Sequence, residues 1–436
     1  MHLYDLPLLF VLVGLALYTV LGGADFGAGI WQLTAGGGAS AKRIRDHAHD
    51  AMAPVWEANH VWLIVVLTVT WTAYPAAFAS IASTLCVPLF IAAVGIILRG
   101  ATYALRSGAS SPREMRLIDT GFAISSVLTP FALGTVVGAI ASGRVPVGNA
   151  AGNLITSWTG SVSITIGVLA VATAAYLAAV YLAADAARLG DSWLENQFRA
   201  RALIIGVVAG AAAIAGLVVL RANVHPLYHR LVNGDGAPAL VVSILAGVTT
   251  LALVWWRRYE LARYSAALAV VAIIAGWALA QQPRLLPGLT VAQAAAPRDT
   301  LVLVVVAVLA GGVILFPSLG LLFRLLLHGQ FDPNAAARPG TLSSRRRVAR
   351  PRSGLLTRTA VACLVTGFGL LVVADAAWAH AIGVTCLLVF IALAFSAIGP
   401  DEIASIDPGD TEVAAHGGDV PLRASGRGRY RASTRR

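Results

Sequence analysis

Apolar runs of about 20 residues recur along this chain, and a helix needs a run of that length to cross the hydrocarbon of a bilayer. Of its 436 residues, 58% are hydrophobic and 12% are charged, which lies outside the usual range of soluble domains. The net charge of +11 does not indicate nucleic acid, because the basic residues lie between apolar runs and near the C-terminus. We therefore predict an all-α integral membrane protein with no nucleic-acid partner.

Hydropathy divides residues 1–328 into predicted membrane spans, nine in all, at residues 7–31, 60–79, 81–99, 118–141, 162–184, 203–220, 240–256, 266–280 and 301–327. The first run has no basic residue before it and exceeds the apolar core of a signal peptide, so we expect it to remain as a span. Residues 359–398 form a further apolar stretch, long enough for an extra C-terminal two-helix hairpin. A basic linker at 329–358 precedes the hairpin, and a polar, flexible tail at 399–436 follows it.

Basic residues mark one side of the predicted bundle, because they concentrate in alternate connections between spans. These connections hold Lys42, Arg43, Arg45, Arg106, Arg113, Arg116, Arg188, Arg199, Arg201, Arg257, Arg258 and Arg263. Cytoplasmic connections of membrane proteins carry the excess of Lys and Arg. The N-terminus is therefore predicted outside, and the linker, the tail and the C-terminus are predicted in the cytoplasm.

Four ionisable residues fall at the ends of predicted spans: Asp25, Glu57, Arg99 and Asp119. A charged group costs roughly 2.5–3.5 kcal/mol at mid-bilayer on insertion scales, so it persists where it is paired or useful. The predicted topology places all four in the cytoplasmic portion of one four-helix group. Arg99 has a structural interpretation, in which it pairs with Asp25 or Asp119 and holds the helices together.

Glu57 has no basic neighbour in the sequence, and a carboxyl in a partly apolar setting suits proton transfer, so we predict a proton carrier there. Trp56 alone is typical of an interfacial anchor, and His60 alone of a hydrogen-bonded helix residue. No second histidine stands at a helical spacing that favours a haem pair, so we predict that this chain ligates no haem iron. The cysteines also lack the spacing of metal ligands, and we predict no metal site.

Three stretches carry a family resemblance: GGADFG at residues 22–27, APVWEANHVWL at 53–63, and Arg99 with Arg106 after the third predicted span. Their order and spacing resemble those of subunit II of the cytochrome bd quinol oxidases. The segment QPRLLP at 282–287 is similar to the outer segment before the last span of that family. The resemblance covers about residues 1–328.

This resemblance implies a nine-span fold, arranged as two four-helix groups and a peripheral helix. It also implies a haem-free subunit of a complex that oxidises quinol and reduces dioxygen to water. Haem b and haem d are then expected in a partner, subunit I. This chain would support assembly, proton delivery from the cytoplasm and oxygen access.

The resemblance also suggests residue roles. Glu57 and Asp25 fall on the family's proton pathway, and Trp56, Arg99 and Asp119 fall on positions linked to the haem environment or to stability. Asn59 and His60 lie in the second signature stretch. The sequence departs from some members at Glu57, where they carry aspartate, and at Ala104, where they carry a second acid.

The expected location is the bacterial cytoplasmic membrane, with membrane lipid and a small accessory subunit as further partners. A structural quinone or lipid between the helices is also compatible with the resemblance. The alternative function is a proton-coupled secondary transporter, for which internal repeats and helices broken at midplane are typical. The second half shows no repeat of the stretches around Asp25 and Glu57, and the ionisable residues lie at the inner ends of spans. A purely structural membrane scaffold is the third class.

Overall fold

The computed structural model describes residues 2–106, 111–327, 354–373 and 376–397. Within these ranges, the side chains of residues 53–58 and of several positions near helix ends lie outside the description. The chain divides into two compact units, Met1–Gln330 and Phe331–Arg436.

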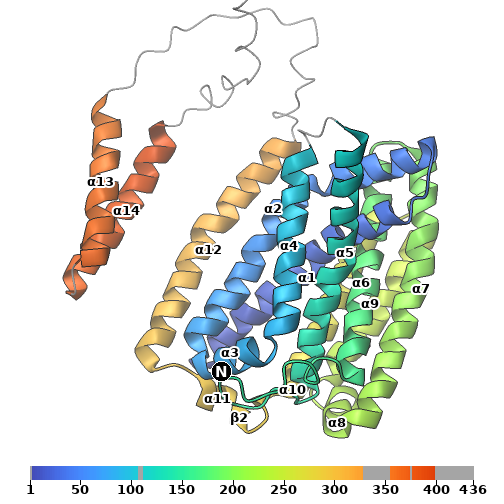
Figure 1. The fold of residues 1–436 in the computed structure, drawn as a ribbon, viewed down its shortest axis with the longest axis horizontal. Coiled ribbons are helices and arrows are strands. Elements are labelled where there is room, and N and C mark those ends of the chain that lie inside the picture. The colour runs from blue at the N-terminus through green and yellow to red at the C-terminus, as the bar shows by residue number, and fades with distance from the viewer. Residues whose placement is uncertain (1, 107–110, 328–353, 374–375, 398–436) are drawn as a thin grey trace, which may run out of the picture. The chain divides into compact units, whose positions relative to one another are not determined.

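The larger unit begins with a group of four long helices, α1 (Asp5–Leu33), α2 (Ala39–Ala73), α4 (Cys86–Arg106) and α5 (Pro112–Ala141). In this group α1 packs against α2 and α5, and α4 packs against α5 (Figure 1). A short helix, α3 (Pro75–Thr84), joins α2 to α4.

A second group of four follows, made of α6 (Ser161–Arg188), α7 (Ser192–Asn223), α9 (Ala237–Trp255) and α10 (Tyr259–Gln281). The short helix α8 (His225–Asn233) connects α7 to α9. Helix α6 packs against α7 on one side and against α1 and α5 on the other, so it joins the two groups (Figure 1).

A small hairpin and a peripheral helix complete the larger unit. Strands β1 (Arg284–Leu286) and β2 (Leu289–Thr290) pair antiparallel and lead into the short helix α11 (Val291–Ala294). The long helix α12 (Arg298–Leu327) then contacts α1 and α2. The arrangement of two four-helix groups with a peripheral helix is therefore confirmed.

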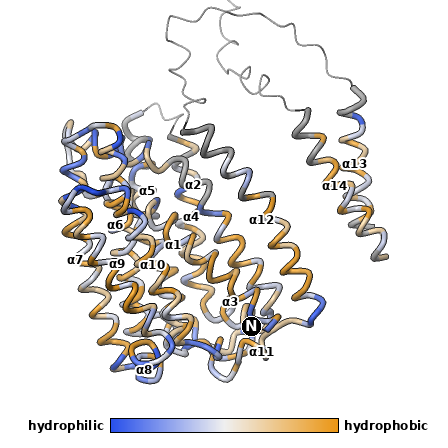
Figure 2. The backbone as a smooth tube through the Cα atoms, turned by 180° about the vertical axis from the view of Figure 1, so that it is seen from behind, coloured by the Kyte–Doolittle hydropathy of each residue, from blue (hydrophilic) through white to orange (hydrophobic). Residues whose placement is uncertain are grey.

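The helices have the length and composition of membrane spans. Six of the described helices are long and apolar enough to cross a bilayer, or seven if the bent pair around Leu85 forms one span. Figure 2 shows that hydrophobic residues follow the helices of the larger unit and that hydrophilic residues gather near their ends. The all-α membrane fold is confirmed, whereas the count of nine spans stays a prediction.

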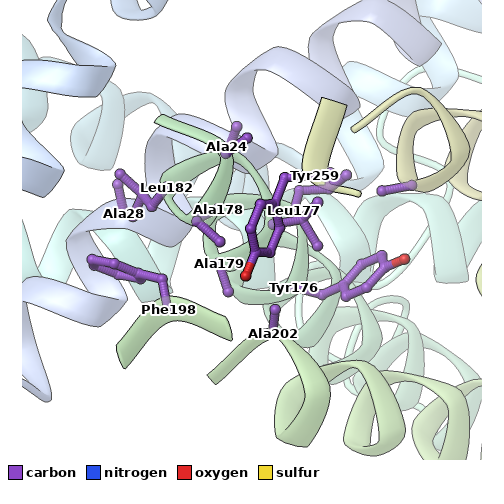
Figure 3. Close-up of a cluster of buried hydrophobic side chains, with 14 of the residues drawn as sticks. Ala24, Ala28, Tyr176, Leu177, Ala178, Ala179, Leu182, Phe198, Ala202 and Tyr259 are labelled. Carbon is purple, nitrogen blue, oxygen red and sulfur yellow. The ribbon is translucent and has the colours of Figure 1, made fainter. Parts of the chain in front are cut away.

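Small residues allow α1 and α6 to approach closely. A Cβ atom added at Gly27 would collide with the carbonyl group of Ala174 on α6, so only glycine fits there. Alanines continue this contact, with Ala24 and Ala28 of α1 against the Ala178 region of α6 (Figure 3). Such packing is common where lipid, which is as apolar as the side chains, gives helices no hydrophobic reason to associate.

The start of α2 differs from the sequence prediction. The apolar part of α2, Asn59–Ala73, begins where the span was predicted, but the helix itself begins at Ala39 and includes Lys42, Arg43 and Arg45 of the predicted basic connection. The turn before α2 contains Gly36 and Gly38, whose positive φ angles favour glycine. The added segment is helical because Ile44, Ala48 and Met52 recur at helical spacing and are buried in the core that α6 lines.

The third predicted span also differs. Residues 81–99 were predicted as one helix, but α3 ends at Thr84 and lies at 82° to the helix that begins at Cys86. Leu85 breaks the helix with φ −105° and ψ 25°. Pro88 lies in the first turn of α4, where its missing N–H costs no hydrogen bond, so the chain restarts a helix there. Hydropathy does not detect this bend because both arms are apolar.

The smaller unit contains α13 (Gly354–Val373) and α14 (Ala377–Ala397), which lie side by side (Figure 1). Gly367 faces the carbonyl oxygen of Gly383, so the two backbones are close. Most of the predicted linker at 329–358 and all of the predicted tail at 399–436 lie outside the described residues.

Candidate functional site

A buried ion pair joins α1 to α4 in the first four-helix group. The Nε of Arg99 donates to Oδ2 of Asp25 at 2.8 Å, and Nη2 donates to Oδ1 at 2.6 Å. Nη2 also donates to the backbone carbonyl oxygen of Asp25. Both side chains are 0% exposed. This two-pronged geometry is the strongest that an arginine and a carboxylate can form.

Two further helices bond to the pair. The side-chain amide of Asn59 on α2 donates to Oδ2 of Asp25 at 3.2 Å. Nη1 of Arg99 donates to the hydroxyl of Ser126 on α5 at 2.9 Å, and this hydroxyl donates to the carbonyl oxygen of Phe122 at 2.6 Å. One polar cluster therefore connects α1, α2, α4 and α5. We call these four residues, Asp25, Asn59, Arg99 and Ser126, the polar cluster.

Aromatic rings and glycines shape the space around Arg99. The guanidinium carbon lies 4.8 Å from the centre of the Phe26 ring and 4.1 Å from that of Phe122, so both rings stabilise the cation. Gly29 on α1 leaves room for Ser126, because an added Cβ atom would collide with the Ser126 hydroxyl. The cluster thus depends on a small residue on α1 as well as on its polar groups.

Several buried polar atoms near the polar cluster have no hydrogen-bond partner among the described residues. They include Oδ1 of Asn59, the hydroxyl of Tyr18 and the hydroxyl of Thr129. Tyr18 belongs to one buried cluster with Phe26, whose ring contacts Arg99. Thr129 lies against Gly95, one turn before Arg99 on α4. Buried polar groups in proteins are usually bonded to protein or to ordered water, so this region has the chemistry of an internal hydration site.

The electrostatics of the polar cluster favour a clamp between helices. Asp25 and Arg99 neutralise each other where an isolated charge would be expensive, and removing one partner of such a pair costs about 3–5 kcal/mol. Because Asn59 and Ser126 bond to the same pair, the clamp also fixes the rotation of α2 and α5. The arrangement can hold helices in register and keep polar atoms inside an apolar bundle.

Most of the predicted site residues that can be placed meet in this cluster. Of the two acids considered as partners of Arg99, Asp25 forms the pair described above. Asp119 lies near the start of α5, roughly two turns before Ser126, where it lines a surface groove. His60 is half-buried beside Asn59 on α2.

Glu57 and Trp56 belong to α2, but their side chains lie outside the described part of the chain. Their predicted roles therefore stay predictions. No group of three or more His, Cys, Asp or Glu residues could hold a metal ion within the residues that the structure describes.

Sequence reasoning missed Ser126 and Phe122, and it included Phe26 only as part of the stretch GGADFG. Ser126 and Phe122 are four residues apart, so they share one face of α5, and this spacing could have identified them. It also missed the groove of about 610 Å³ that α1, α2 and α5 line, with Gln32 and Arg45 at its polar end. We call this the α1–α5 groove. Its lining comes from three separate helices, so no local pattern marks it.

Comparisons with known proteins agree with this architecture. The sequence model of the cytochrome bd terminal oxidase subunit II family matches residues 3–326. The cytochrome bd ubiquinol oxidase subunit 2 of Bacillus subtilis (strain 168) is 26% identical over 134 residues, which are 31% of this chain and 39% of that protein. The cytochrome bd-I ubiquinol oxidase subunit 2 of Escherichia coli (strain K12) is 27% identical over 135 residues, 30% of this chain and 35% of that protein.

The alignments thus span well under half the length of these two relatives. A chain in the structure of bd oxidase from Geobacillus thermodenitrificans has the same fold, with a TM-score of 0.62 and 24% identity. The match covers 75% of this chain and 99% of that one. Because the family model matches well over half of the sequence, this chain belongs to the cytochrome bd terminal oxidase subunit II family.

Proposed function

We propose that this chain is the haem-free subunit II of a cytochrome bd-type quinol:oxygen oxidoreductase in a bacterial respiratory chain. The observation that carries the proposal is the family match over residues 3–326, on a fold with two four-helix groups. In this proposal subunit I is the partner and holds haem b and haem d. Quinol is the substrate of the complex, and dioxygen is reduced to water.

The contacts of His47 do not fit the role of an axial haem ligand. Among the described side chains His47 is the buried histidine, and its Nε2 lies 3.1 Å from the carbonyl oxygen of Leu182. Its Nδ1 faces Asp185 at 3.9 Å, so both ring nitrogens are directed at protein groups. In this proposal the electron-transfer steps belong to subunit I, and this chain contributes to assembly, proton delivery and oxygen access.

Within the complex, the polar cluster positions α2. Asn59 bonds to Asp25, and Glu57 precedes Asn59 by two residues on the same helix. The clamp thus fixes the backbone that carries Glu57, which is the proposed proton carrier. Asp25, which the resemblance places on the proton pathway, is proposed here with Arg99 as a positioning residue, since the guanidinium engages both carboxylate oxygens. Trp56 and Asp119 are proposed as further residues of the haem environment.

The proposed orientation follows the basic residues, with the N-terminus outside and the C-terminus in the cytoplasm. Protons for water then come from the cytoplasm, which makes turnover electrogenic. Residues 1–328 form the nine-span domain of this proposal, and the α13–α14 hairpin adds two spans. A small accessory subunit and membrane lipid complete the proposed complex.

Substitution of Glu57 tests proton delivery. Glu57→Gln removes the ionisable group at nearly constant shape, whereas Glu57→Asp keeps it and shortens its reach. In complexes with equal haem content, we expect quinol-driven oxygen uptake to fall at least tenfold in Glu57→Gln and much less in Glu57→Asp, a range typical of proton-transfer groups. Equal turnover in both variants and the wild type would refute a proton-carrying Glu57.

A further inference from the structure

The α1–α5 groove is lined by α1, α2 and α5 of the first four-helix group and is partly open. Its volume of about 610 Å³ falls within the range of small-molecule sites, roughly 300–1,000 Å³. One wall consists of apolar residues of α5 that recur along the helix, including Phe122, Ile124, Val127 and Phe131. Ile124 and Val127 are 51% and 38% exposed, so the described residues leave this wall uncovered.

Polar groups lie at one end of the α1–α5 groove. Gln32 of α1, Arg45 of α2 and Asp119 with Thr120 of α5 line it there, and the apolar wall begins at Phe122. The groove is therefore polar at one end and apolar along the rest of its length. A molecule that fills it needs the same division between a polar head and an apolar chain.

Arg45 supplies a cationic donor at the polar end, and Asp119 contributes a carboxylate to the lining of the same end. Its Nη1 donates to the carbonyl oxygen of Gly36 at 2.9 Å, which anchors the side chain near the groove. A guanidinium has five N–H donors in a planar fork, so further donors remain for a ligand. Phosphate is the anion that this fork matches well, because it can accept two parallel hydrogen bonds.

Gln32 provides a second, independent sign of a ligand. The residue is 7% exposed, it lines the α1–α5 groove, and its Nε2 has no hydrogen-bond partner among the described residues. A buried donor without a partner costs free energy, unlike one that is bonded.

These features select one class of occupant. A prenylated quinone shares the long apolar chain and the oxygen acceptors, but it carries no negative charge for Arg45. A phospholipid has the chain, the ester oxygens and the phosphate.

We propose that the α1–α5 groove binds one phospholipid, with an acyl chain along residues 122–131 and its phosphate at Arg45 beside Gln32. The site is separate from the polar cluster, and it does not depend on the oxidase function proposed above. The bound lipid would cover apolar surface of α1 and α5 and would stabilise the contact between these helices and the first turns of α2.

The test uses the full chain, purified in mild detergent with the proteins that accompany it in its native membrane. Extracted lipids are quantified, and rebinding of phosphatidylglycerol to the delipidated sample is followed by native mass spectrometry. Arg45→Gln removes the phosphate contact, and Val127→Trp fills the apolar part of the groove. Lys42→Gln, which removes an exposed charge one turn away, and Ile204→Trp, on an exposed face of α7, are the matched controls.

We expect about one tightly held phospholipid per chain in the wild type and in both controls. Arg45→Gln should weaken rebinding about fivefold, the usual contribution of one basic residue to anionic lipid. Val127→Trp should abolish the tight site. Unchanged rebinding in Arg45→Gln and Val127→Trp would overturn the proposal.

Two other results would identify a different occupant and would also overturn the proposal. One is a prenylated quinone extracted at about one per chain and lost in Val127→Trp, with phospholipid unaffected. The other is efficient cross-linking of Ile124→Cys to another protein chain, because a protein would then cover this wall.

Discussion

The side-chain amide of Asn59 lies 3.2 Å from Oδ2 of Asp25, the same oxygen that accepts from Arg99. One carboxylate therefore connects three helices, α1, α2 and α4. Ser126 adds α5 to this connection, because its hydroxyl accepts a hydrogen bond from Nη1 of Arg99. The polar cluster acts on helix positions as a unit, so its members should not behave independently under mutation.

Loss of the Asn59 amide should change turnover more than assembly. Asn59→Ala removes the bond that fixes α2 at Asp25, and we expect several-fold lower quinol-driven oxygen uptake in complexes with normal haem content. The pH profile of oxygen uptake should shift as well, because Glu57 lies two residues before Asn59 on the same helix. Thr68→Ala, on an exposed part of α2, is the control. An unaltered pH profile with reduced stability would assign Asn59 to structure alone.

The Asp25–Arg99 pair should show a strong coupling in a double-mutant cycle. Arg99→Met or Asp25→Leu leaves a buried charge without its partner, and each should destabilise the protein by about 3–5 kcal/mol. The double variant should recover a large part of that loss, since no buried charge remains. Thermal unfolding in detergent gives the stability of the wild type, the two single variants and the double variant. Additive single effects would show that the pair does not contribute as a unit.

Gly29 should be intolerant of even a methyl group. Gly29→Ala places a Cβ atom where the Ser126 hydroxyl lies, so the helices must separate, at a cost of about 1–3 kcal/mol. Gly210→Ala on α7 is the matched control, because an added Cβ there meets nothing within 4 Å. We expect the control to be neutral or slightly stabilising. Equal melting temperatures for both variants would contradict the close approach of α1 and α5.

Asp191 lies in the connection between α6 and α7. Its carboxylate should make the stability of the fold depend on pH in the acid range. The N–H of Leu194 at 3.0 Å and the guanidinium of Arg43 at 2.5 Å lower the pKa of its carboxyl below the ordinary 3.8. A carboxyl whose pKa is lowered in the folded state stabilises the fold fully at a pH above its ordinary pKa. This stabilisation is lost as the pH falls through the folded-state pKa.

Asp191→Asn keeps a capping oxygen but loses the charge. Its melting temperature should lie below that of the wild type at neutral pH, and the difference should shrink as the pH falls below 4. A difference that stays constant over this range would show that the charge of Asp191 does not stabilise the connection.

The sequence was sufficient to predict an all-α membrane protein. It was also sufficient to predict that oppositely charged residues meet between the helices. Asp25 and Arg99 could be predicted to converge because each is an isolated charge near the same end of a span, and hydropathy sets that depth. The choice between Asp25 and Asp119 as partner depends on helix rotation, which hydropathy does not contain.

Some helix boundaries were predicted wrongly for a related reason. The basic stretch at the start of α2 reads as a connection, yet Ile44 and Ala48 bury one face of it against the second helix group. The bend at Leu85 lies between two apolar arms, so it leaves no trace in hydropathy. The α1–α5 groove arises only when three helices meet, and its residues have no common motif.

Affinity purification of this chain from its native membrane is the most direct test of its proposed place in an oxidase. A reduced-minus-oxidised visible spectrum and quinol-driven oxygen uptake are then recorded on the same sample. We expect a second large subunit, bands of haem b and haem d, and oxygen consumption to co-purify with the chain. A colourless preparation that lacks such a partner and consumes no oxygen would contradict the proposal that this chain is an oxidase subunit.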